Sequence, residues 1–228
     1  MKAYKPHLLI VSMIYVMLYY MTCILDQKLV SFGFFSVPAP YLYFTFIYPL
    51  SDAIVEVYGP RLTWFLLLCG YFTMVIFALM TLGIIHLPNP AGIRYDLIQK
   101  DYDLLDSAIL MCMSFGYLAF FIGMFINVKL LAKFKIKFNG KHYYLRSIVA
   151  SCVSELAVSI ISNVLIWGSR VTEANLIKLI VFGYLLLLLI TPIWAIVGKF
   201  LKDILYICEG EQAYVYNTHF WKMILGKK

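Results

Sequence analysis

Long apolar runs separated by short polar connections dominate the chain. A helix that crosses a bilayer needs about 20 mainly apolar residues, and six runs approach or exceed that length. The runs are continuous rather than alternating, and lipid offers no partner to an open backbone, so the pattern predicts an all-α helical bundle and not a barrel. We expect six transmembrane helices near residues 7–25, 41–58, 62–85, 107–131, 147–167 and 176–200.

Composition indicates a membrane protein with no separate soluble domain. The 228 residues are 63% hydrophobic and only 14% charged, against about 25% charged in soluble domains. We therefore expect residues 1–228 to form one integral membrane domain that ends in a cytoplasmic tail at 201–228. The apolar run near the N-terminus is too long for a signal peptide and lacks a small-residue cleavage site, so we interpret it as a retained helix.

The basic residues predict the orientation in the membrane. With six spans, 14 of the 19 Lys and Arg residues lie on the side of the two termini, and the positive-inside rule assigns that side to the cytoplasm. Basic residues beside anionic headgroups are ordinary in membrane proteins, and no nucleic-acid-binding motif accompanies the net charge of +7. The expected partners are the bilayer and a small molecule, not nucleic acid, and the oligomeric state stays open.

The five cysteines show no spacing typical of a metal site. Four of them lie in the apolar runs, where a cysteine most simply acts as a small packing residue. We expect no bound metal, no cofactor and no disulfide framework.

Carboxylates stand inside two of the apolar runs. Asp52 and Glu56 are one helical turn apart and share a face of the second helix, although an ionised carboxylate near the bilayer centre costs at least ~2.5 kcal/mol. Pro49, three residues before Asp52, predicts a kink beside the two acids. Glu155 lies near the middle of the fifth helix, and Ser159 follows it by one turn.

These polar residues predict a cavity between the second and fifth helices. The two helices are the middle members of the two halves of a 3+3 arrangement, which inverted-repeat transporters use for their central site. Asn127, near the cytoplasmic end of the fourth helix, either reaches this site or bonds a neighbouring helix. We expect no buried Lys or Arg to balance the three acids, which favours a functional cavity over three separately buried carboxyl groups.

Two stretches carry a resemblance to a known family. The segments CILDQKLVSFGFFSVP and YPLSDAIVEVYGPR resemble the queuosine precursor transporter family, also described as a vitamin uptake transporter family, whose members have six transmembrane helices. The resemblance implies uptake of 7-deazaguanine bases, with Asp52 and Glu56 at the motif positions. A carboxylate can accept the N1 hydrogen and the 2-amino group of a guanine-like edge together, and adenine lacks that donor pair.

The leading hypothesis is a transporter of the bacterial inner membrane that imports queuosine precursors or a related purine-like base or nucleoside, and that is not an enzyme. Its expected substrate-binding residues are Asp52, Glu56, Asn127, Glu155 and Ser159.

Three rival hypotheses stay open. The nearest rival is a substrate-capture subunit of a multi-protein vitamin transporter, because the chain lacks a nucleotide-binding loop of its own. An intramembrane enzyme with an acid and base pair is less favoured, since no nucleophile, metal cluster or phosphate site accompanies the acids. A structural protein without a cavity would tolerate amide replacements of Asp52 and Glu56.

Overall fold

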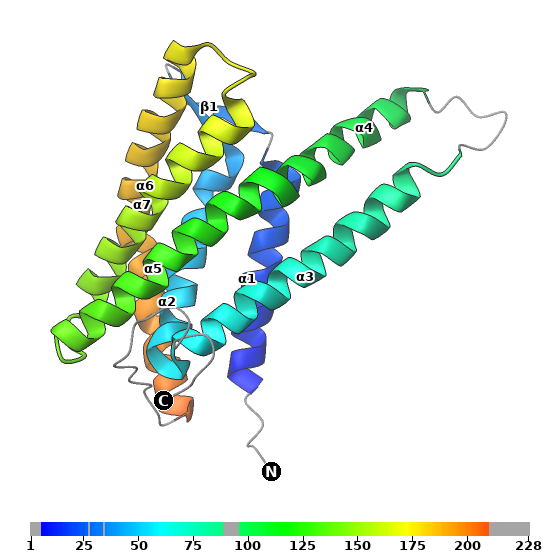
Figure 1. Cartoon of the computed structure of the whole chain (residues 1–228). Helices are drawn as coiled ribbons and strands as arrows, with labels where there is room; N and C mark the ends of the chain where they lie inside the picture. Colours follow the sequence, from blue (N-terminus) through cyan, green and yellow to red (C-terminus); the bar gives the residue numbers. More distant parts are fainter. Residues whose placement is uncertain (1–5, 27, 34, 89–95, 210–228) are drawn as a thin grey trace.

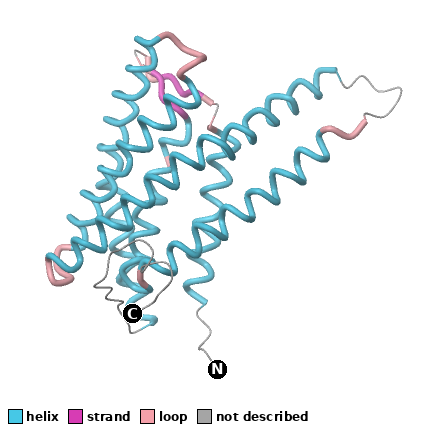
Figure 2. The backbone as a smooth tube through the Cα atoms, viewed as in Figure 1, coloured by secondary structure: helices cyan, strands magenta, loops and turns pink. Residues whose placement is uncertain are grey.

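The fold is a bundle of helices with one short β-hairpin (Figures 1 and 2). The structure is a computed structural model, and it describes residues 6–26, 28–33, 35–88 and 96–209. The elements in chain order are α1 (Pro6–Leu25), β1 (Leu29–Ser31), β2 (Ser36–Pro38), the 3-10 turns η1 (Ala39–Leu42) and η2 (Phe44–Phe46), α2 (Ile47–Tyr58), α3 (Pro60–Ile85), α4 (Asp96–Met111), the π-helical turn η3 (Cys112–Gly116), α5 (Tyr117–Lys137), α6 (Tyr143–Trp167) and α7 (Glu173–Glu209).

The surface is apolar and the interior holds polar groups, the reverse of a soluble protein. Phe72 in α3 is 67% exposed, whereas Asp52, Asn127 and Ser147 are fully buried. Four helical runs in the described residues are long and apolar enough to cross a membrane, at Pro60–Ile85, Gln99–Lys137, Tyr143–Trp167 and Glu173–Cys208. Because exposed apolar side chains are stable only against lipid, the chain is an all-α, multi-pass membrane protein.

The second predicted helix is much shorter than expected. Its α-helical part, α2, has 12 residues and is therefore about 18 Å long, which is less than the hydrocarbon thickness of about 30 Å. Residues 41–46, which were expected to be α-helical, fall in the turns η1 and η2, with Tyr43 between them. Pro49 lies in the first turn of α2, where its missing N–H is tolerated, so the proline marks the start of the helix and does not kink it.

A sharp turn joins α2 to α3. Gly59 has φ +90°, a conformation that side chains rarely adopt, and Pro60 follows as the first residue of α3, where its fixed φ suits a helix start. The sequence Tyr-Gly-Pro therefore reverses the chain in a single residue.

The fourth and sixth predicted helices are longer than expected. The fourth helix was expected to begin near residue 107, but the acidic segment before it is helical from Asp96 in α4, where Gln99 Nε2 donates to Asp103 Oδ1 one turn away at 3.0 Å. With η3 and α5 it forms one helical run. The last helix, α7, continues to Glu209 instead of ending near residue 200 and contains Pro192. Residues 210–228 of the expected tail lie outside the described residues.

The connections alternate between the two ends of the bundle (Figure 1). The start of α1, the α2–α3 turn, the α5–α6 turn and the end of α7 lie at one end, which we call the terminal end. The β-hairpin and the α6–α7 connection lie at the opposite end, where Figure 2 shows the two strands in magenta. The strands pair antiparallel, with Val30 opposite Val37.

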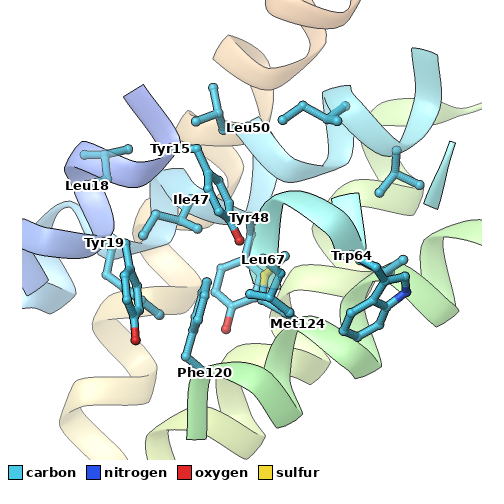
Figure 3. Packing of buried hydrophobic residues seen from close by; sticks show 14 of the residues in the cluster. Tyr15, Leu18, Tyr19, Ile47, Tyr48, Leu50, Trp64, Leu67, Phe120 and Met124 are labelled. Atoms are coloured by element: carbon cyan, nitrogen blue, oxygen red, sulfur yellow. The ribbon is translucent and has the colours of Figure 1, made fainter. Parts of the chain in front are cut away.

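The main core joins α1, α2, α3 and α5. Figure 3 shows Tyr15 and Tyr19 from α1, Tyr48 from α2 and Phe120 from α5 within this cluster. Tyr19 and Phe120 have ring centroids 5.1 Å apart, a separation typical of favourable ring packing. The core at this level is therefore largely aromatic.

One cysteine departs from the expected role of packing residue. Cys112, the first residue of η3, is disulfide-bonded, so the prediction that no disulfide would form is wrong. Cys69, Cys152 and Cys208 are free. Spacing along the chain cannot reveal such a bond, because it depends on which cysteines the tertiary fold brings together.

Glycine sets the distance between α2 and α7. A methyl group on Gly198 would lie 2.5 Å from Pro49 Cβ and 3.0 Å from the Pro49 carbonyl oxygen. We therefore expect Gly198→Ala to push the two helices apart and to lower the stability of the purified protein by about 1–3 kcal/mol, measured by thermal unfolding in detergent.

Gly70→Ala in α3 is the matched control, because nothing lies within 4 Å of its added methyl group and alanine favours a helix. Equal stability of the two variants would contradict the close packing of α2 on α7.

Candidate functional site

Asp52 is fully buried and ties three helices together. Its Oδ1 accepts a hydrogen bond from Asn127 Nδ2 of α5, and its Oδ2 accepts one from Ser147 Oγ of α6, both at 2.5 Å. Both carboxyl oxygens thus have protein donors, which offset the cost of burying the group. Of the five residues predicted for the site, Asp52 and Asn127 are brought into direct contact.

Glu56, one turn further along α2, belongs to a buried ion cluster. Arg146 in the first turn of α6 donates Nη2 to Glu56 Oε1 at 3.0 Å and Nη1 to Oε2 at 3.2 Å. Lys135 Nζ lies 3.5 Å from Glu56 Oε1 and donates to the Glu56 carbonyl oxygen at 2.9 Å. Arg146 is only 2% exposed, so the expectation of no buried cation beside the acids is wrong.

The same arginine fastens the α5–α6 turn. Arg146 Nε donates to the Lys141 carbonyl oxygen at 2.8 Å, and Nη2 donates to that of Gly140 at 3.2 Å. Arg146 and Lys135 were counted among the charges that flank the membrane, whereas the fold turns both inward at the terminal end. Arg61, which follows the α2 motif directly, is exposed.

Glu155 contacts α7 and not α2. The Thr191 hydroxyl lies 2.9 Å from Glu155 Oε1 and 2.7 Å from Oε2, and it is also 2.7 Å from the Leu187 carbonyl oxygen. A hydroxyl has one hydrogen to donate, so it can serve only one of these acceptors at a time. Glu155 is 1% exposed and forms its own polar contact between α6 and α7.

Ser159 belongs to a further polar contact, nearer the hairpin end. Tyr41 of η1 donates its hydroxyl to Ser159 Oγ at 3.3 Å, and Asn163 Nδ2 donates to the Tyr41 hydroxyl at 2.6 Å and to the Ser159 carbonyl oxygen at 2.7 Å. All five predicted site residues are therefore buried, but they fall into four separate contacts along the bundle and do not surround one space.

A cavity lies beside these contacts, in the half of the bundle nearer the hairpin. It is small, about 30 Å³, and lies between α1, the turns η1, η2 and η3, α5 and α6. None of the five predicted residues lines it. Its lining residues are Tyr19, Thr22, Asp26, Pro40, Tyr41, Phe44, Cys112, Gly116, Phe120, Val158 and Ser162.

Asp26 is the acidic residue of this cavity, and the sequence interpretation missed it. It directly follows α1, its Oδ2 atom is buried, and that atom has no hydrogen-bond partner among the described residues. Burial raises the pKa of Asp26 to about 7, as expected for a carboxyl group removed from water. A lone acid at a predicted helix end resembles an ordinary loop residue, and the signal that could have singled it out is its place in the stretch CILDQKLVSFGFFSVP, which carries the family resemblance.

The cavity walls are largely aromatic. Phe44 and Phe120 have ring centroids 5.6 Å apart, and the Tyr19 ring also packs against Phe120. Figure 3 shows Tyr19 and Phe120 close together in the core. Flat apolar walls with one carboxyl group suit a planar heterocycle, and the walls must separate to admit one, because the cavity in this conformation is smaller than such a ring. No group of three or more His, Cys, Asp or Glu residues that could hold a metal ion occurs in the described part of the chain.

Comparison with known proteins identifies the family. A family model described as "putative vitamin uptake transporter" matches residues 38–198, more than half of the chain. The chain belongs to this family. The family is consistent with a small-molecule substrate and a membrane environment. No curated protein and no solved structure matched this transporter.

The ion cluster of this transporter makes a prediction about stability. Removing one partner of a buried ion pair leaves an uncompensated charge, which costs about 3–5 kcal/mol. We expect Arg146→Gln to lower the free energy of unfolding by about 2–3 kcal/mol, somewhat below that range, because Lys135 remains beside Glu56. Thermal unfolding of the purified transporter in detergent measures the change.

Arg61→Gln provides the control, since Arg61 is exposed and surface charges contribute little. If Arg61→Gln destabilises the protein as much as Arg146→Gln, the assignment of the cluster fails.

Proposed function

We propose that this transporter imports a 7-deazaguanine base, or a related purine-like base or nucleoside, across the bacterial inner membrane. The observation that carries the proposal is the aromatic cavity with its buried carboxyl group, inside a member of a vitamin uptake transporter family. A purine-like base has two flat faces that pack on aromatic rings and an edge of N–H donors that a carboxylate accepts.

The proposed orientation puts both termini in the cytoplasm. Its support is the excess of Lys and Arg at the terminal end. In this orientation the cavity lies in the outer half of the bundle and the Glu56–Arg146 cluster lies in the cytoplasmic half. We include six membrane crossings in the proposal, with α1 as the first and η1, η2 and α2 together as the second, and a 3+3 inverted repeat that pairs α2 with α6.

The buried polar contacts form the proposed path from the cavity to the cytoplasm. Ser159 lies nearest the cavity through Tyr41, which lines it. Glu155, and then Asp52 with Asn127, follow toward the terminal end. Asp52 already accepts two donors from protein side chains, and a guanine-like edge offers two donors of the same kind. Substrate can therefore replace Asn127 and Ser147 at little net cost in hydrogen bonds.

Glu56 has a different part in this proposal. Its partners Arg146 and Lys135 close the cytoplasmic half of the bundle while the cavity holds substrate. Inward release requires α2 to separate from the first turn of α6, which breaks the two hydrogen bonds from Arg146 to Glu56. The cluster thus supports a transport cycle in which one half of the bundle stays closed.

Uptake of labelled 7-cyano-7-deazaguanine tests the proposal. Cells unable to synthesise the base are compared with and without the protein. We expect uptake only with the protein, and a decrease of about 10-fold or more for Asp52→Asn, because an amide cannot accept the donor pair of the substrate as a carboxylate does.

Asp203→Asn is the control at matched membrane levels, because Asp203 is half-exposed in α7 and forms its ion pair with the neighbouring Lys202. Absence of uptake by a well-expressed protein would overturn the substrate assignment. Uptake that depends on a co-purifying ATPase would favour a capture subunit.

A further inference from the structure

Two polar atoms without partners line the cavity. The Oδ2 atom of Asp26 and the hydroxyl of Tyr19 are buried, and neither has a hydrogen-bond partner among the described residues. Buried polar atoms in native proteins are nearly always hydrogen-bonded. An acceptor and a donor that lie unmatched on the wall of one cavity therefore point to a ligand that supplies the missing partners.

The Asp26 carboxyl group lies opposite η3 and forms no ion pair among the described residues. Its Oδ2 lies 3.8 Å from the position that a Cβ on Gly116 of η3 would occupy, so the glycine leaves open the space in front of the carboxyl group. A ligand with N–H donors would supply the partners that this carboxyl group lacks.

The walls around the carboxyl group are held in place. Tyr41 is fixed by the bond from Asn163 and by its own bond to Ser159. A ring held by two hydrogen bonds offers a flat surface at little entropic cost on binding. The π-helical turn η3 brings Cys112 and Gly116 to the same space, and such turns are frequent at functional sites.

We infer that Asp26 determines which substrate this transporter binds, by accepting two adjacent N–H donors from the edge of a planar heterocycle, while the Tyr19 hydroxyl donates to a neighbouring carbonyl oxygen of the same edge. This inference rests on the proposed import function. The substrate class is a guanine-like heterocycle with a carbonyl oxygen, a ring N–H and an exocyclic amine in sequence. Adenine presents no such edge.

Binding to the full-length protein in lipid nanodiscs tests the inference by isothermal titration. The ligands are 7-cyano-7-deazaguanine, guanine, hypoxanthine, which lacks the amine, adenine, and two further flat compounds, pterin and thiamine. We expect the first two to bind most tightly, hypoxanthine to bind about 10-fold more weakly and adenine more weakly still, because each lost donor leaves a buried acceptor unpaired.

The variants separate recognition from folding. Asp26→Asn should weaken binding of the guanine-like ligands by about 10- to 100-fold and reduce the preference over adenine. Tyr19→Phe keeps the ring and should weaken the binding of ligands that have the carbonyl oxygen by about 5-fold. Asp101→Asn, at an exposed acid of α4, is the matched control and should bind as the wild type does. Thermal unfolding without ligand checks that every variant is folded.

The outcomes distinguish this inference from the proposed function. Tight binding of 7-cyano-7-deazaguanine that is unchanged in Asp26→Asn would overturn the inference and leave the proposed function intact. Binding of pterin alone, lost in Asp26→Asn, would support the inference and overturn the proposed substrate. Binding of no ligand in the set by folded wild-type protein would overturn both.

Discussion

The hydrogen bonds to Asp52 are the constraint on which the rest of the bundle depends. In a hydrocarbon environment a carboxyl group must find its partners inside the protein, because neither water nor lipid supplies them. Asn127 from α5 and Ser147 from α6 meet this need. α2 must therefore lie against both helices at one depth, and Glu56, one turn further on, then reaches Arg146 and Lys135.

The short α2 follows from the same arrangement. A helix of 12 residues cannot cross the bilayer alone, and the chain before it enters the bundle as a hairpin and two 3-10 turns. Backbone without regular helical bonding is tolerated at membrane depth where protein or a cavity surrounds it. Here that segment contributes Tyr41 and Phe44 to the cavity wall, so the irregular backbone and the cavity occur together.

The polar groups divide into those that are satisfied and those that are not. Asp52, Glu56 and Glu155 each have protein partners in this conformation, whereas the Oδ2 atom of Asp26 has none among the described residues. The satisfied carboxyl groups hold the helices in register. When a substrate offers equivalent donors, these groups can exchange their protein partners for the substrate. The unsatisfied group lies where a ligand can first reach it. A transporter needs both kinds, because substrate must be recognised and the helices must then exchange partners.

The sequence by itself determined the membrane class, the approximate positions of most long helices and the burial of Asp52, Glu56, Asn127, Glu155 and Ser159. These properties depend on local hydropathy and on the cost of polar groups in lipid, and both can be evaluated residue by residue. Only the tertiary structure decided that Arg146 and Lys135 turn inward, that η1 and η2 replace the start of a helix, and that Asp26 lines a cavity. Those outcomes depend on which segments meet, because the hydropathy around a carboxyl group at a helix end does not reveal that α5, α6 and η1 close around it.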